Sequence, residues 1–266
     1  MRVPRDELPA VDAFDLTGSS FSALAQRIAP EVWRGMTAAV PIEHVEGTTI
    51  VALVYNGGVV IAGDRRATSG NVISKRDMRK VFEADGWSAL GISGAAGPAV
   101  DMARIFATEL EHYEKVEGAP LSLEGKANKL AQMVRANLPM AMQGLVVVPL
   151  FAGYDPRQGV PRIYEFDAAG GRYEEKRFAT SGSGGRDARG SLKARYRPDF
   201  TFDEAVDAAI ESLWDAADED SATGGPDLVR GIYPLVAVID AAGYREIAED
   251  RIAGRVETVI AARRVV

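Results

Sequence analysis

The sequence predicts an α+β fold in which two stacked antiparallel β-sheets are covered by helices on their outer faces. Strand-like segments come first, two amphipathic helices follow, and further strands and helices complete the chain, an order typical of layered α+β domains. Tight turns join neighbouring strands, which favours antiparallel pairing over the parallel sheets of nucleotide-binding folds. With 266 residues, of which 47% are hydrophobic, the chain is long enough to bury a large core.

The first two hairpins are indicated by buried strands around tight turns. Residues 49–55 form an apolar run, an Asn-Gly-Gly turn follows at residues 56–58, and residues 59–62 return as a second strand. A second hairpin is expected from strands at residues 79–83 and 87–93.

Two amphipathic helices are expected next, at residues 100–113 and 121–143, because apolar side chains recur there at helical spacing. The same reasoning applies to the rest of the chain. The later elements are expected, in order, as strands at 145–154, 162–167 and 172–180, a helix at 203–217, a strand at 232–240, a short strand, and a last helix at 249–263.

The composition excludes several classes of protein. The chain has no cysteine, so disulfides, thiolate metal sites and cysteine nucleophiles are all excluded. Of its two histidines, His112 is expected on a helix surface and His44 lies in the N-terminal segment, so catalysis by imidazole is not expected. The formal net charge of -7 argues against nucleic acid as the main partner.

The sequence also predicts where the protein is found. No apolar run approaches the roughly 18 to 20 residues of a membrane-spanning helix, and the first residues are too polar for a secretory signal. We therefore expect a cytoplasmic protein with no membrane partner, and neither a metal nor a cofactor.

The first 47 residues differ from the rest of the chain. They are interrupted by Pro4, Pro9, Pro30 and Pro41 and show little sustained periodicity. The strand pattern begins abruptly after them, so this segment is interpreted as a leader or a loosely held extension.

Three charged side chains lie at the ends of the first strands: Asp64, Arg66 and Lys80. Antiparallel pairing brings strand ends together, which would place Lys80 beside Asp64 and beside the hydroxyl of Thr48. Burial there would weaken the preference of Lys80 for its charged form, while Asp64 would act oppositely. A surface salt bridge without a function is the alternative, and the residue pattern alone leaves both open.

Several short motifs follow one another along nearly the whole chain. They are GTTIV at 47–51, GDRRAT at 63–68, RKV at 79–81, GISG at 91–94, ELEHYEK at 109–115, AMQGL at 141–145 and DEDSATGGPD at 218–227. Each is weak alone, but in their order and spacing they resemble the β subunits of the 20S proteasome in its actinobacterial form.

This resemblance implies the N-terminal-nucleophile (Ntn) hydrolase fold, a four-layer αββα sandwich of two antiparallel sheets. It also implies that residues 1–47 are a propeptide, removed by self-cleavage between Gly47 and Thr48, and that residues 48–266 are a threonine protease domain. While Gly47 is attached, the nitrogen of Thr48 is an amide without basicity, so the protease would be inactive before the cut.

By the same resemblance, Thr48 is the nucleophile and a polar network surrounds it. Its implied members are Asp64, Lys80, Asp220, a serine near Gly182, and Thr223, which stands where a serine is more usual. The serine is assigned to Ser183, although the local run SGSGG at 181–185 leaves Ser181 as the alternative.

The free α-amine of Thr48, with an intrinsic pKa of about 8, would serve as the base for its own hydroxyl through a water. Lys80 would assist proton transfer, Asp64 would orient Lys80, and Asp220 would help hold the amine. Gly94 is the candidate backbone donor to the oxyanion, because glycine permits close approach.

The substrate is expected to bind as an added strand along Ala67 and Thr68 and along residues 94–96. By analogy with the family, the pocket for the residue before the cut predicts an apolar preference, and it would be lined by Ala67, Met78, Ile92 and Ala96.

The resemblance implies partners as well. These are proteasome α subunits and other β subunits in a 28-mer of stacked seven-membered rings, an ATP-dependent unfoldase ring, and polypeptide substrates. Two alternatives are the peptidase of the simpler bacterial two-ring protease, opposed by length and by the motif at 220–227, and a catalytically silent structural subunit. The presence of Thr48, Asp64, Lys80 and Asp220 together argues against a silent subunit.

Overall fold

The computed structural model describes residues 45–263. These residues belong to the second of two units into which the chain divides, Met1–Ile42 and Glu43–Val266. Most of the expected propeptide, with His44, lies outside the described residues.

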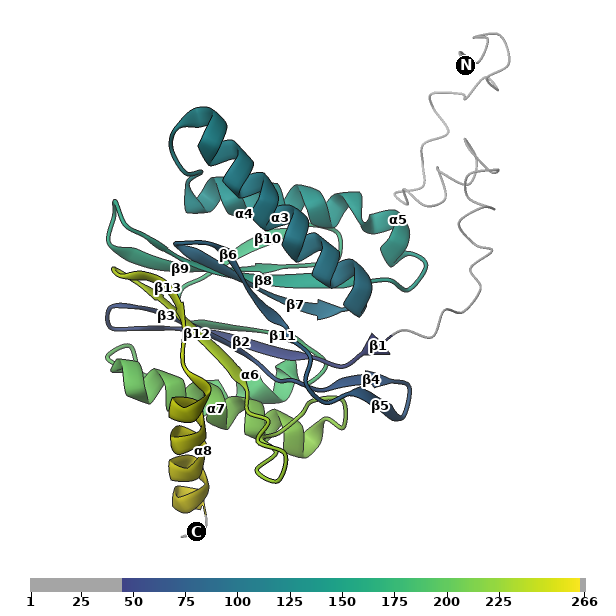
Figure 1. Ribbon diagram of the computed structural model, residues 1–266, viewed down its shortest axis with the longest axis vertical. Coiled ribbons are helices and arrows are strands. Elements are labelled where there is room, and N and C mark those ends of the chain that lie inside the picture. Colours follow the sequence, from purple (N-terminus) through teal and green to yellow (C-terminus); the bar gives the residue numbers. More distant parts are fainter. Residues whose placement is uncertain (1–44, 264–266) are drawn as a thin grey trace, which may run out of the picture. The chain divides into compact units, whose positions relative to one another are not determined.

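Two five-stranded antiparallel sheets form the centre of the described unit (Figure 1). The first sheet contains, in spatial order, β10 (Arg172–Glu175), β9 (Val160–Phe166), β8 (Val147–Asp155), β7 (Ser88–Gly94) and β6 (Val81–Asp85). The second contains β11 (Phe178–Gly182), β2 (Thr49–Tyr55), β3 (Gly58–Gly63), β12 (Leu235–Asp240) and β13 (Gly243–Glu246).

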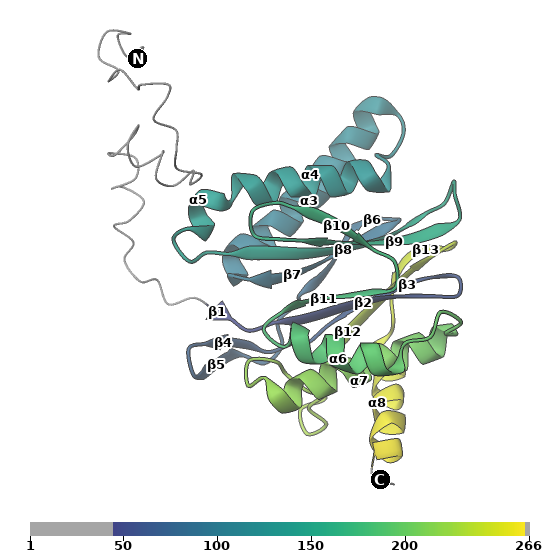
Figure 2. The same ribbon diagram turned by 180° about the vertical axis from the view of Figure 1, so that it is seen from behind.

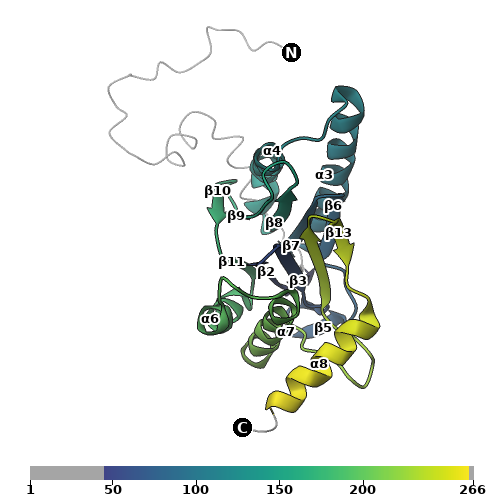
Figure 3. The same cartoon turned by 90° about the vertical axis from the view of Figure 1, so that its left-hand side faces the viewer.

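Helices cover the outer face of each sheet, as Figures 2 and 3 show from two further sides. The helices on the first sheet are α3 (Ala96–Glu117), α4 (Leu123–Ala136) and the short α5 (Leu138–Ala141). Those on the second are α6 (Gly185–Arg195) and α7 (Phe202–Glu219), and α8 (Glu249–Arg263) packs against α7. The order helix, sheet, sheet, helix confirms the predicted α+β sandwich and the Ntn-hydrolase fold.

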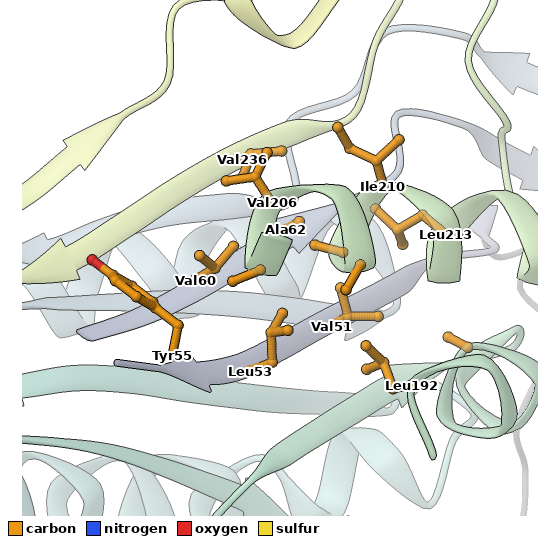
Figure 4. Packing of buried hydrophobic residues seen from close by; sticks show 14 of the residues in the cluster. Val51, Leu53, Tyr55, Val60, Ala62, Leu192, Val206, Ile210, Leu213 and Val236 are labelled. Atoms are coloured by element: carbon orange, nitrogen blue, oxygen red, sulfur yellow. The ribbon is translucent and has the colours of Figure 1, made fainter. Parts of the chain in front are cut away.

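Strand β2 contributes to two of the three hydrophobic clusters of the core, because both of its faces are buried. Ile50 and Ala52 point into the cluster between the two sheets. Val51 and Leu53 point the other way, into the cluster with α6, α7 and α8 (Figure 4). This two-sided burial explains why the strand reads as a continuous apolar run rather than an alternating one.

A third, three-stranded sheet was not predicted. It consists of β1 (Val45–Glu46), β4 (Ala67–Ser69) and β5 (Val72–Lys75). Its strands have two to four residues each, which is too short for an alternating pattern to be recognised in the sequence.

Two predicted elements are corrected by the structure, and one helix was not predicted. The expected helix at 121–143 ends at Ala136, and a separate turn of helix follows around Pro139. In a continuous helix Pro139 would have no N–H for the Arg135 carbonyl, and its ring would clash with that carbonyl. The expected strand at 172–180 is two strands: β10 pairs with β9 in the first sheet, and β11 pairs with β2 in the second.

Helix α6 is the helix for which the sequence analysis made no prediction. Its buried residues are only Gly185, Ala188, Ser191 and Leu192, so it lacks the wide apolar stripe that marks the other helices. In the part of the chain that the structure describes, no helix has the length and apolar character needed to cross a membrane.

Candidate active site

Thr48 lies immediately before β2, at the end of the second sheet nearest β4. Its side chain is almost completely buried, with 6% of the residue exposed. The hydroxyl Oγ1 donates a hydrogen bond of 2.6 Å to the carbonyl oxygen of Gly47. The hydroxyl therefore already lies beside the bond at which cleavage is expected.

Lys80 and Asp64 form a buried ion pair next to this bond. Asp64 follows the last residue of β3 and Lys80 precedes β6, and they are 1% and 3% exposed. The Lys80 ammonium donates to Asp64 Oδ1 at 2.6 Å, to the Gly47 carbonyl oxygen at 2.9 Å, and to the carbonyl oxygen of Arg66. The alternative of a surface salt bridge is wrong, because both charges are inside the protein.

The surroundings of the pair act on the two groups in opposite senses. Burial lowers the pKa of Lys80 below its usual value, and the charge and hydrogen bond of Asp64 oppose that change. The Asp64 carboxylate also accepts hydrogen bonds from the backbone amides of Thr49 (2.8 Å), Arg66 (2.9 Å) and Gly224 (2.8 Å). With four donors directed at it, the carboxylate has the partners that a buried charge requires.

A second carboxylate, Asp220, lies at the C-terminal end of α7 on the other side of Thr48. Its Oδ2 accepts hydrogen bonds of 2.6 Å from both Ser183 Oγ and Thr223 Oγ1. Partial burial alone would raise the pKa of Asp220, but the hydrogen bonds from Ser183 and Thr223 outweigh it and hold the pKa below its usual value. The threonine in place of the more usual serine thus keeps its contact with the carboxylate.

The structure distinguishes the two candidate serines. Ser183 lies next to Thr48, whose backbone nitrogen donates to Ser183 Oγ at 3.5 Å. Ser181 instead points between the two sheets, where its hydroxyl is 2.8 Å from that of Ser93. Only Ser183 joins the network around the nucleophile.

Gly94 ends β7 with a backbone φ of 103°, a conformation that side-chain-bearing residues rarely adopt. A Cβ atom at this position would lie 2.1 Å from the carbonyl oxygen of Val146. The neighbouring strands therefore demand a glycine here, at the edge of the pocket that contains Thr48.

A small pocket opens beside Thr48. Four of the side chains expected to contact substrate line it: Ala67, Met78, Ile92 and Ala96. Thr68 is not part of the lining but lies on β4, next to Ala67. The sequence analysis missed four further lining residues: Arg79, Phe82, Ala99 and Val100. The last two lie on α3, which begins at Ala96 rather than at the expected residue 100.

The sequence analysis also missed one polar residue near the nucleophile. The backbone amide of Thr49 donates a hydrogen bond to the Asp64 carboxylate. The hydroxyl of Thr49 contacts the hydroxyl of Thr223, and the two Oγ1 atoms are 2.6 Å apart. Alternation along β2 could have placed the side chain of residue 49 on the same face as that of Val51, towards α6 and α7, but it gave no indication of the partners there.

Comparisons with known proteins show the family to which the chain belongs. The proteasome subunit family model matches residues 45–229. Proteasome subunit beta of Acidothermus cellulolyticus is 61% identical over 227 residues, which are 84% of this chain and 78% of the relative. The subunit of the same name from Acidimicrobium ferrooxidans is 58% identical over 249 residues, 92% of this chain and 90% of that one.

A third relative, proteasome subunit beta of Frankia casuarinae, is 51% identical over 259 residues, covering 96% of this chain and 94% of its own. The relatives carry the proteasome name rather than that of the simpler two-ring protease. This chain therefore belongs to the proteasome subunit family, as one of its β subunits.

Proposed function

We propose that this chain is the precursor of a threonine endopeptidase, which cuts itself between Gly47 and Thr48 and then uses Thr48 to hydrolyse polypeptides. The observation that carries the proposal is the position of the Thr48 hydroxyl. It lies between the Lys80–Asp64 pair and the Ser183–Asp220–Thr223 network, within hydrogen-bond distance of the Gly47 carbonyl. Residues 48–266 would be the mature protease and residues 1–47 the propeptide.

Self-cleavage needs a polarised carbonyl and a nearby hydroxyl. Lys80 donates to the Gly47 carbonyl oxygen and so draws electron density from its carbon. In the proposed step, Thr48 Oγ1 bonds to that carbon, the bond from Gly47 to the Thr48 nitrogen breaks, and the nitrogen takes the hydroxyl proton. Water then hydrolyses the resulting ester, leaving a carboxylate on Gly47 and both a free amine and a free hydroxyl on Thr48.

The segment before the cut already lies where a substrate is expected. Strand β1 pairs antiparallel with β4, with Val45 opposite Ser69 and Glu46 opposite Thr68. The pairing with Thr68 overlaps the added-strand position that the sequence analysis assigned to substrate. The chain's own residues thus support both the processing step and the direction in which a later substrate would bind.

After processing, the α-amine of Thr48 would act as the base, in place of a histidine. An α-amine has a pKa of about 8, close enough to neutrality to accept a proton from the hydroxyl. Ser183 would hold this amine, Lys80 would stabilise the charge that develops beside the hydroxyl, and the Gly94 amide would donate to the oxyanion.

We expect the pocket beside Thr48 to favour substrates with an apolar residue before the cut. Apart from Arg79 and Lys80 the lining carries no charge, and these two cations are already paired, with Glu246 and Asp64. An acidic side chain in the pocket would therefore be desolvated without a counter-ion of its own. Fluorogenic peptides ending in leucine or phenylalanine should be hydrolysed at least about tenfold faster, as kcat/KM, than the matched peptide ending in glutamate. Equal rates for the two would contradict the assigned pocket.

The processing step is tested by the intact mass of the chain after assembly with proteasome α subunits. We expect the mass of residues 48–266, with Thr48 as the first residue. A chain that stays at full length would favour a catalytically silent structural subunit, and a chain beginning at any other residue would contradict the proposed nucleophile.

Membership of the family implies assembly with other proteasome subunits. We further propose the arrangement implied by the sequence motifs, a cytoplasmic 28-mer of α and β rings to which an ATP-dependent unfoldase delivers substrates. Enclosure in such a barrel would keep a broad peptidase away from folded proteins.

A further inference from the structure

A second set of hydroxyl groups lies behind the nucleophile, on the face of β2 directed towards α6 and α7. Thr49 Oγ1 and Thr223 Oγ1 are 2.6 Å apart, and both residues are completely buried. Thr223 Oγ1 is also 2.6 Å from Asp220 Oδ2, and the backbone amide of Gly184 donates to Thr49 Oγ1 at 3.1 Å.

The direction of each hydrogen bond in this set follows from counting protons. An amide nitrogen can only donate, an ionised carboxylate can only accept, and each hydroxyl has one proton to donate. Thr223 donates its proton to Asp220, so its oxygen accepts the proton of Thr49, and Thr49 in turn accepts from Gly184. These hydrogen bonds therefore all point in one direction, from the Gly184 amide through Thr49 and Thr223 to Asp220.

A second series of hydrogen bonds leads from the nucleophile to Asp220. Ser183 Oγ donates to the same Oδ2 atom at 2.6 Å, and its oxygen accepts from the Thr48 nitrogen. Both series of hydrogen bonds thus end at the Asp220 carboxylate. Besides these hydroxyls, the groups around its carboxylate are the backbone amide of Ala222 and, at longer range, the ammonium of Lys80.

The two threonine hydroxyls are packed closely against Gly184. A Cβ atom on Gly184 would lie 2.5 Å from Thr49 Oγ1, 2.7 Å from Thr223 Oγ1 and 3.1 Å from the Ala216 Cβ. The contact between the two threonines is therefore direct, and glycine at position 184 is what allows the helix α6 to begin so close to β2.

We propose that Thr49 is a positioning residue for hydrolysis: its hydroxyl, donating to Thr223, orients Asp220 and through Ser183 the amine of Thr48. This inference rests on the proposed role of Thr48. Hydrogen bonds in a chain polarise one another, so loss of the first hydroxyl weakens the hold of Thr223 on Asp220 and leaves the carboxylate less fixed. The amine then spends less time in the orientation that accepts the proton of the Thr48 hydroxyl.

The expected signature is a change in kcat without a change in KM. The Thr49 side chain faces α6 and α7, and Thr49 is not among the residues that line the pocket beside Thr48. In assembled particles, Thr49→Val, which keeps the shape and removes the hydroxyl, should lower kcat about fivefold, the usual effect of one net hydrogen bond. KM should stay within about twofold of wild type, since substrate contacts are unchanged.

The pH profile supplies a readout that a loss of packing alone does not move. The acidic limb of the kcat profile reports the Thr48 amine, which must be unprotonated to act as the base. The Asp220 carboxylate, reached through Ser183, favours the protonated amine, so a less firmly held carboxylate lowers the pKa of that amine and should shift the limb to lower pH. Thr49→Ser, which restores the hydroxyl, should return both kcat and the limb to near wild type. Ser212→Ala is the matched control, since it removes another completely buried hydroxyl, bonded to the Ala209 carbonyl within α7, and should leave both unchanged.

Rates are counted per active site, with the processed fraction from intact mass and the active fraction from a covalent threonine-directed inhibitor. A Thr49→Val chain that stays uncut while Thr49→Ser is cut would support the same hydroxyl-dependent role. Wild-type kcat and pH profile in Thr49→Val would overturn the inference, as would equal losses in Thr49→Val and Thr49→Ser. If either of these results were found while Thr48→Ala was inactive, only the role of Thr49 would be wrong. A Thr48→Ala particle that hydrolysed peptides would overturn the proposed function itself.

Discussion

Replacing Thr48 by alanine is expected to leave the chain uncut and to abolish peptide hydrolysis. The hydroxyl that contacts the Gly47 carbonyl is then absent, so neither self-cleavage nor attack on a substrate has a nucleophile. Loss of a nucleophile typically lowers kcat by about 10⁴-fold or more. The measurement is hydrolysis of a fluorogenic peptide by assembled particles, together with the intact mass of the chain.

Thr48→Ser is the control for this variant, because it keeps a hydroxyl and, after cleavage, an α-amine. We expect the serine chain to be cut at the same bond and to retain measurable hydrolysis, since the Lys80 and Ser183 contacts involve backbone atoms that are unchanged. An alanine variant with more than about 1% of wild-type kcat would be incompatible with Thr48 as the nucleophile.

Replacing Lys80 by methionine should lower activity although the nucleophile is still present. The hydroxyl and amine of Thr48 remain, but the charge beside them is lost and the buried Asp64 carboxylate has no counter-ion. We expect kcat to fall by about 10² to 10⁴-fold, the usual contribution of a positioned proton-transfer group. The free energy of unfolding should also fall by about 3–5 kcal/mol, because one charge of a buried pair is left alone.

The chain contains a matched control for the second of these effects. Lys126 is 2% exposed and pairs with Asp85 at 2.5 Å, at the opposite end of β6 from Lys80. Lys126→Met should therefore destabilise the protein to a similar extent while leaving kcat unchanged. If both variants lost activity equally, the effect of Lys80→Met would be structural, and Lys80 would have no part in the chemistry.

Local patterns predicted the elements that have a strong local signal. The turn at residues 56–58 and the apolar strands around it appear as β2 and β3, and the last helix was predicted at the bounds of α8. The split of residues 172–180 into β10 and β11 had no such signal, because a strand in either sheet has the same pattern. Only the position of the partner strands decides which sheet each half joins.

The residues of the candidate site also divide into those with a signal in the sequence and those whose role depends on their partners in the fold. The motifs named Asp64, Lys80, Asp220 and Thr223, and each of these side chains lies in a network around Thr48. Thr49 was missed because its importance depends on Gly184 and Thr223, which are distant in sequence and reach it only through the packing of α6 and the loop after α7.

By itself, the sequence determined the layered α+β fold, the family, and the hydroxyl, amine and charged groups available for chemistry, because strand periodicity and motif spacing are properties of the chain alone. The tertiary structure decided that the Lys80–Asp64 pair is buried rather than exposed, that Ser183 rather than Ser181 lies beside Thr48, and that Thr49 connects to Asp220. Each of these depends on desolvation or on hydrogen bonds of a few ångströms between residues far apart in sequence. Such contacts exist only once the two sheets and their helices have packed together.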